Sequence, residues 1–162
     1  MNELLDRLAR EIELNSKANE RLRLAFGYAC TRRVEQLLEE PGVVDCLRGL
    51  GQYLQSMIDP DEFAAYQSTA ARLANQHQGS KSIDGCGHAA VSATYAVANA
   101  LAGKALQAAE YAAYALVYGQ GGYGAVADLE SFQSEFSWQV NCLASLAGKS
   151  QRAEIELPST AS

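Results

Sequence analysis

Residues 88–118 read HAAVSATYAVANALAGKALQAAEYAAYALVY, and this stretch decides the fold of the chain. Alanine dominates it, and Lys104 and Glu110 are its only acidic or basic residues. Its larger side chains recur every three or four residues on both sides of Gly103, which predicts two helices separated or kinked at that glycine. A helix so poor in charge is buried on most sides. We therefore expect an alanine-rich helix pair at the centre of a bundle.

More strongly charged, amphipathic segments flank this stretch on both sides. Their apolar residues follow helical spacing, and no segment shows the sustained alternation of a β-strand. The fold class is therefore all-α: an irregular bundle of six or seven helices around the alanine-rich central pair. Besides the central pair, the predicted helices cover residues 3–14, 17–39, 43–57, 60–77 and about 124–146.

Proline, glycine and aspartate mark the expected helix boundaries. In Asp59-Pro60-Asp61-Glu62, the aspartate at 59 can cap a helix whose first turn holds the proline and two acidic residues. Residues 119–122 (GQGG) predict a flexible break, and Gly148 resembles a helix stop. We expect one helical domain over residues 1–149 and a flexible C-terminal tail over residues 150–162.

The charge balance restricts the classes of partner. The chain has 162 residues, with 19 acidic against 13 basic ones and a net charge of −6. A net negative charge argues against direct binding of nucleic acid or of an anionic membrane, and it suits a basic protein partner. Solubility alone also explains it. Residues 88–103 are too short and too weakly apolar to span a bilayer, and the opening MNELLDRLAR does not resemble a secretory signal. We expect a cytoplasmic protein.

Few residues suggest catalysis or metal binding. The four cysteines (Cys30, Cys46, Cys86, Cys142) are far apart, so free thiols are expected. Cys86 and His88 could form a nucleophile–base pair, but the segment favours the simpler explanation that Ser82 or Asp84 caps a helix and the glycines allow a tight turn. The chain has two histidines, too few for a usual zinc site, and no Glu-x-x-His motif of di-iron bundles. We expect no catalytic residue, metal or cofactor.

Acidic residues and tyrosines supply the candidate contact surface. Tyr111, Tyr114 and Tyr118 share one helix face, which favours core packing and is also compatible with a recognition surface. Acidic residues that are not needed for the core gather at two expected helix starts. The partner-binding candidates are Asp59, Asp61, Glu62, Asp128, Glu130 and Glu135, with Tyr118 and Tyr123 as an alternative surface.

Several short segments of the chain carry a resemblance to a known protein family. They are residues 21–26 (RLRLAF), 29–30, 33–34, 82–85 (SIDG), 88–90, the alanine-rich 95–115, and 138–140 (WQV). Together they resemble a helical family of immunity proteins from bacterial polymorphic toxin systems, over about residues 20–147. The resemblance implies a bacterial cytosolic protein that binds and neutralises a cognate toxin, frequently a nuclease with a basic surface. We expect a monomer or a homodimer. The remaining hypotheses are a helical scaffold that self-associates through its alanine-rich face, and a small enzyme using Cys86 and His88.

Overall fold

The structure is a computed structural model that describes residues 1–77 and 86–156, except for the side chains of residues 86 and 151–156. Within these ranges it contains seven α-helices, three short 3-10 helices and no strand, which confirms the all-α prediction. The α-helices are α1 (Glu3–Glu11), α2 (Glu20–Arg32), α3 (Pro41–Leu54), α4 (Pro60–Gln76), α5 (Cys86–Leu101), α6 (Ala105–Ala127) and α7 (Gln133–Glu156). The 3-10 helices are η1 (Lys17–Asn19), η2 (Glu35–Leu37) and η3 (Leu129–Phe132).

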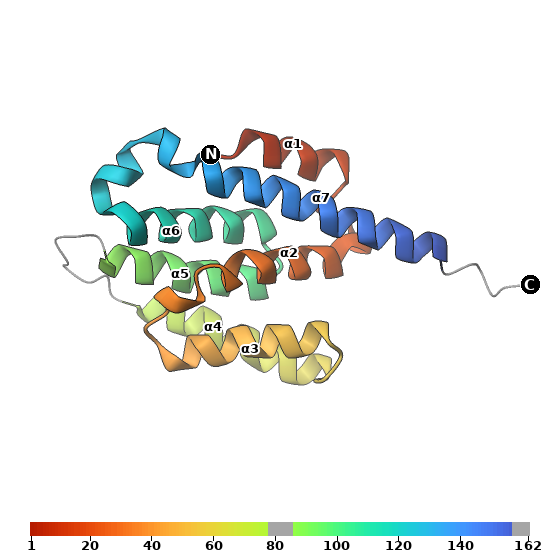
Figure 1. Cartoon of the computed structure of the whole chain (residues 1–162). Helices are drawn as coiled ribbons and strands as arrows, with labels where there is room; N and C mark the ends of the chain where they lie inside the picture. The colour runs from red at the N-terminus through yellow and green to blue at the C-terminus, as the bar shows by residue number, and fades with distance from the viewer. Residues whose placement is uncertain (78–85, 157–162) are drawn as a thin grey trace, which may run out of the picture.

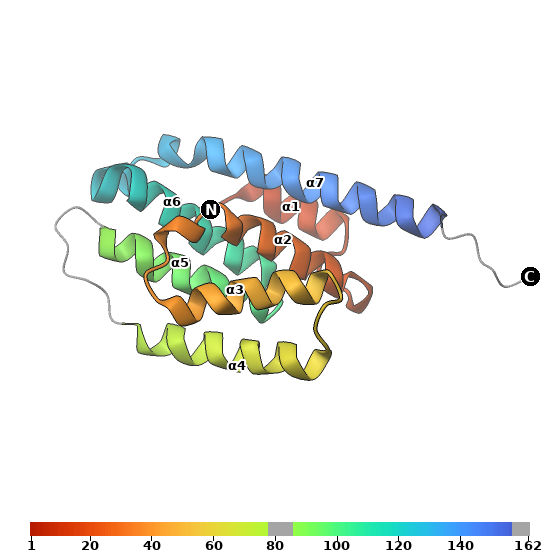
Figure 2. The ribbon, with the colours of Figure 1, turned by 60° about the horizontal axis from the view of Figure 1, so that its bottom comes forward.

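The alanine-rich pair lies at the centre of the bundle, as predicted. Helices α5 and α6 run antiparallel, with α1 and α7 on one side, α3 and α4 on the other, and α2 lying along them (Figures 1 and 2). A Cβ added at Gly27 of α2 would lie 3.0 Å from Ala100 Cβ of α5, so these two backbones approach closely because both residues are small. The central pair buries Ala93, Ala96, Ala100, Ala105, Ala108 and Ala112.

Two hydrophobic clusters share the central pair. One joins α1, α2 and α7 to it through residues such as Leu5, Phe26 and Leu143. The other joins α3 and α4 to it through residues such as Leu47 and Phe63. Because α5 and α6 contribute to both clusters, they hold the two sides of the bundle together.

In the first half of the chain, the predicted start of α4 is confirmed, whereas α1 and α2 are shorter than predicted. Asp59 caps α4, since its side chain accepts a hydrogen bond of 2.8 Å from the Glu62 amide, as predicted. Helix α1 ends at Glu11, earlier than expected, and Glu13 adopts a positive φ of 54°. Helix α2 ends at Arg32, and a separate 3-10 helix follows instead of the predicted continuation to residue 39.

The second half departs further from the prediction. Helix α6 bends at Gly122, where φ is 63° and ψ is −150°, and then continues to Ala127. The last α-helix begins at Gln133 and passes through Gly148 to Glu156, so the prediction of a stop at that glycine is wrong. Residues 150–156, expected in the flexible tail, are helical, and residues 157–162 lie outside the described residues.

None of the described helices has both the length and the apolar character needed to cross a membrane.

Candidate functional site

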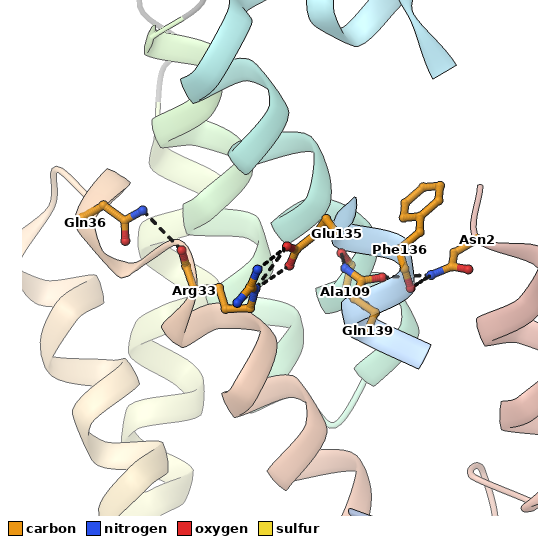
Figure 3. Close-up of polar contacts among 7 residues, drawn as sticks. All are labelled: Asn2, Arg33, Gln36, Ala109, Glu135, Phe136 and Gln139. Carbon is orange, nitrogen blue, oxygen red and sulfur yellow. Dashed lines mark hydrogen bonds and ion pairs between the residues drawn. The ribbon is translucent and has the colours of Figure 1, made fainter. Parts of the chain in front are cut away.

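A buried ion pair links α2 to the start of α7 (Figure 3). Arg33 donates two hydrogen bonds from Nε and one from Nη2 to the carboxylate of Glu135, at 2.8–3.1 Å. The Glu135 side chain is 2% exposed, whereas that of Arg33 is 36% exposed. The two residues are 102 positions apart in sequence, so their pairing fixes α7 against α2.

An aromatic ring completes the surroundings of this guanidinium. The Arg33 guanidinium carbon lies 4.0 Å from the centre of the Trp138 ring, within the range of a cation–π contact. Hydrogen bonds to Glu135 raise the pKa of Arg33 further above its usual value. One carboxylate and one ring therefore hold a single cation in this network.

A second set of polar contacts ties α7 to α1 and α6. The buried Gln139 donates a 2.8 Å hydrogen bond to the Ala109 carbonyl of α6. Asn2 donates to the Phe136 carbonyl at 3.2 Å and to Gln139 Oε1 at 3.3 Å, and its own oxygen accepts from the Leu5 amide (Figure 3). These contacts satisfy buried polar groups and orient α7, so they stabilise the fold.

Glu135 therefore requires a correction. The sequence placed it with Asp128 and Glu130 on an exposed contact surface, but it is buried and paired with Arg33. The register of α7 explains this, because the buried residues of that region recur as Phe132, Glu135, Gln139, Leu143 and Ala147. Glu135 occupies the inward stripe of the helix, and a buried carboxylate needs a cation such as Arg33 within hydrogen-bonding distance.

Three aromatic side chains meet where α5 begins and α6 bends. His88 stacks on Tyr118 with ring centroids 5.4 Å apart and meets Tyr123 edge-on at 5.2 Å. Tyr118 and Tyr123 are also edge-to-face, at 5.9 Å. His88 is exposed, Tyr123 is 47% exposed and Tyr118 is half-buried. We call His88, Tyr118 and Tyr123 the aromatic corner.

The bend at Gly122 positions the aromatic corner. Its combination of φ and ψ is accessible almost only to glycine, so the expected flexible break is a defined change of direction. After the bend the chain returns along α6, and Phe132 of η3 packs edge-on against Tyr114 at 5.2 Å. Tyr114 in turn lies 6.4 Å from Tyr118, which places η3 beside the corner.

Two exposed carboxylates and an exposed leucine follow the aromatic corner in the chain. Asp128 caps η3 by accepting a 3.0 Å hydrogen bond from the Glu130 amide. Asp128 and Glu130 are exposed, as predicted, and Leu129 between them is 77% exposed. Of these surface residues the tyrosines are the type that is enriched at protein interfaces.

The other predicted acidic group lies elsewhere. Asp59, Asp61 and Glu62 are exposed at the start of α4. Figures 1 and 2 show the start of α4 at one end of the bundle and the C-terminal end of α6, which contains the bend, at the opposite end. The predicted acidic candidates therefore lie at opposite ends of the bundle, and only Asp128 and Glu130 lie close in sequence to Tyr118 and Tyr123.

The three tyrosines that share one face of α6 differ in their exposure. Tyr114 and Tyr118 are half-buried, in agreement with core packing, whereas Tyr111 is 39% exposed and stacks on Tyr95 at 5.4 Å. The sequence contains a signal for these pairs. Residues 88 and 118 lie equally far from Gly103, as do residues 95 and 111, so an antiparallel pair that turns there brings them together.

The cysteines and histidines were the remaining residues considered for catalysis or metal binding. Cys30, Cys46 and Cys142 are free, as expected, and burial raises the pKa of all three thiols. The Cys86 side chain and the proposed caps Ser82 and Asp84 lie outside the described residues. Among the described residues no group of three or more His, Cys, Asp or Glu side chains is arranged to hold a metal ion.

Comparison of the chain with protein-family models, curated protein sequences and solved structures finds no match. The resemblance to immunity proteins therefore stays a prediction, and the function is argued from the geometry of the chain itself.

Proposed function

We propose that this chain is a protein-binding protein of the bacterial cytoplasm that neutralises a toxin with a basic surface, and that the aromatic corner contacts the toxin. The observation that carries the proposal is the corner, where Tyr118 and the exposed Tyr123 meet edge-to-face, a few residues before the exposed Asp128, Leu129 and Glu130 in the chain. Tyrosine is enriched among the residues that dominate binding energy at interfaces.

The overall charge supports the same kind of partner. A net charge of −6 attracts a basic protein over long range and repels acidic ones. Electrostatic attraction of this kind speeds association most at low ionic strength. A nuclease toxin, whose substrate is polyanionic, has the basic surface that such an inhibitor requires.

Self-association through the alanine-rich face loses its support. The alanines of the central pair are buried inside the bundle, so a homodimer would have to use another surface. The enzyme hypothesis for Cys86 and His88 stays untested, and loss of a measured activity in Cys86→Ala with intact folding would favour it.

The proposal is tested by recovering the partner and measuring protection. The tagged chain is purified from its native cell, and the bound polypeptide is identified by mass spectrometry. That polypeptide is then expressed in a host with and without the chain. We expect a basic polypeptide that arrests growth alone and is harmless when the chain is present.

Matched tyrosine variants connect the protection to the corner. Tyr118→Ala combined with Tyr123→Ala should weaken protection, and Tyr111→Ala, which removes an exposed tyrosine elsewhere on α6, should not. The proposal is wrong if every recovered polypeptide is harmless when expressed alone, or if the chain fails to protect against it.

A further inference from the structure

A groove of about 340 Å³ lies between α2 and α3, which are side by side in the bundle (Figures 1 and 2). We call it the α2–α3 groove. Its polar lining residues are Tyr28, Arg32, Glu35, Arg48, Gln52 and Gln55. Two arginines therefore share one concave surface in a chain whose net charge is −6.

Tyr28 connects the two walls of the groove. A Cβ added at Gly51 would lie 2.6 Å from the Tyr28 hydroxyl oxygen, so this hydroxyl rests against the backbone of α3 where residue 51 has no side chain. Arg32 donates from Nη1 to the same hydroxyl at 3.1 Å, and its guanidinium carbon lies 5.8 Å from the centre of the Tyr28 ring. Arg48 comes one helical turn before Gly51, on the same side of α3. Tyr28 therefore holds Arg32 toward the part of α3 that carries Arg48.

The acidic partners of the two arginines are exposed. Arg32 pairs with Glu35 at 3.0 Å, and these side chains are 55% and 40% exposed. Arg48 pairs with Asp45 at 3.3 Å, and both side chains are more than half exposed. Exposed ion pairs of this kind contribute little free energy, so an anion of higher charge can compete with the carboxylates. A guanidinium also has five N–H donors, so one or two contacts leave others for a ligand.

A phosphate group matches donors that converge from two helices. Its oxygens point in several directions, so it accepts from two guanidiniums and a hydroxyl at once. A carboxylate has two oxygens in one plane, and a single arginine can occupy both, as Arg33 does with Glu135. The negative net charge disfavours a polyanionic nucleic acid, and the size of the groove suits a small molecule.

We propose that the α2–α3 groove binds a small phosphate-bearing molecule, whose phosphate oxygens accept hydrogen bonds from Arg32, Arg48 and the Tyr28 hydroxyl. The Tyr28 hydroxyl can donate its proton to the ligand while it accepts from Arg32. The inference goes beyond the proposed function, because the groove uses no residue of the aromatic corner and its ligand is not a protein.

The test uses inorganic pyrophosphate as the probe. It is titrated into the ¹⁵N-labelled chain at pH 7.5 and constant ionic strength, and backbone amide shifts are followed. Tricarballylate, which carries a similar charge on carboxylates, is the control anion. We expect saturable shifts at residues 28–35 and 45–55, with a Kd on the order of 0.1–1 mM and binding about 5-fold weaker for tricarballylate.

Two sets of matched variants locate the site. Arg32→Gln and Arg48→Gln should each weaken pyrophosphate binding about 5-fold, whereas Arg10→Gln, which removes an exposed arginine of α1, should change it little. Glu35→Gln releases Arg32 from its carboxylate and should tighten binding about 2-fold. Glu62→Gln changes the net charge equally and should have a smaller effect.

Three results would overturn the inference: no saturable shift, equal binding of tricarballylate, or a loss in Arg10→Gln as large as in Arg32→Gln. Its failure differs from failure of the proposed function. A neutralised toxin without pyrophosphate binding would refute the phosphate site alone, and pyrophosphate binding without any neutralised toxin would refute the proposed function alone.

Discussion

Two regions of this molecule combine aromatic rings with carboxylates, and they differ in burial and in charge compensation. In the first, Glu135 is buried and bound to Arg33 beside Trp138. In the second, Asp128 and Glu130 are exposed at the start of η3, a few residues after Tyr123 in the chain. Only a few residues separate Glu130 from Glu135 in sequence. The comparison teaches that the role of an acidic residue here depends on its long-range partner and on the register of its helix.

The largest expected effect comes from removing the cation of the buried pair. Arg33→Ala leaves the carboxylate of Glu135 buried without a partner, which should lower the free energy of unfolding by about 3–5 kcal/mol. Glu135→Ala should cost less, about 2 kcal/mol, because the 36% exposed Arg33 can be hydrated. Urea denaturation measures both values.

Glu130→Ala is the matched control for this pair, since it removes an exposed glutamate close by in sequence. Its effect on the free energy of unfolding should stay within about 0.5 kcal/mol. Equal losses for Arg33→Ala and Glu130→Ala would contradict the distinction between the two regions.

The bend that builds the aromatic corner gives the next largest effect. Gly122→Ala places a Cβ in a conformation that is nearly restricted to glycine, which should cost about 1–3 kcal/mol or move Tyr123. Gly124→Ala is its control, because an added Cβ there meets no atom within 4 Å and the glycine has no positive φ. Thermal unfolding and tyrosine fluorescence of the two variants test this, and equal behaviour would mean that the bend is not fixed.

A smaller effect is expected from the cap of η3. Asp128→Ala removes the acceptor of the Glu130 amide and should cost about 0.5–1 kcal/mol. Asp128→Asn keeps the acceptor and should recover most of that loss while removing the charge. If the asparagine variant is as unstable as the alanine variant, charge and not the hydrogen bond accounts for the effect.

The sequence was sufficient for the features that depend on local pattern. The scarcity of charge in residues 88–118 identified the central pair, and the Asp59-Pro60 signal identified the start of α4. Asp128 and Glu130 are exposed, as a contact surface requires. Each of these follows from spacing or capping within a few residues.

The sequence was insufficient where distant segments meet. Nothing near Glu135 indicates a partner 102 positions away, although Glu135 and Gln139 do fall on the stripe that contains Phe132 and Leu143. The bend at Gly122 was read as flexible because glycine permits both mobility and a defined positive φ. His88 was considered as a catalytic base, and its position beside Tyr118 becomes visible only from the symmetry about Gly103.

The most direct test compares two glutamates at opposite ends of the bundle. Glu130 and Glu62 are both exposed, and the backbone amide of each donates to a capping aspartate. Glu130→Lys and Glu62→Lys change the net charge equally, so long-range attraction to the recovered toxin falls equally. Stopped-flow association at low salt should show a loss of about 10-fold or more for Glu130→Lys and a much smaller loss for Glu62→Lys. Equal losses, or a larger one for Glu62→Lys, would contradict binding at the aromatic corner.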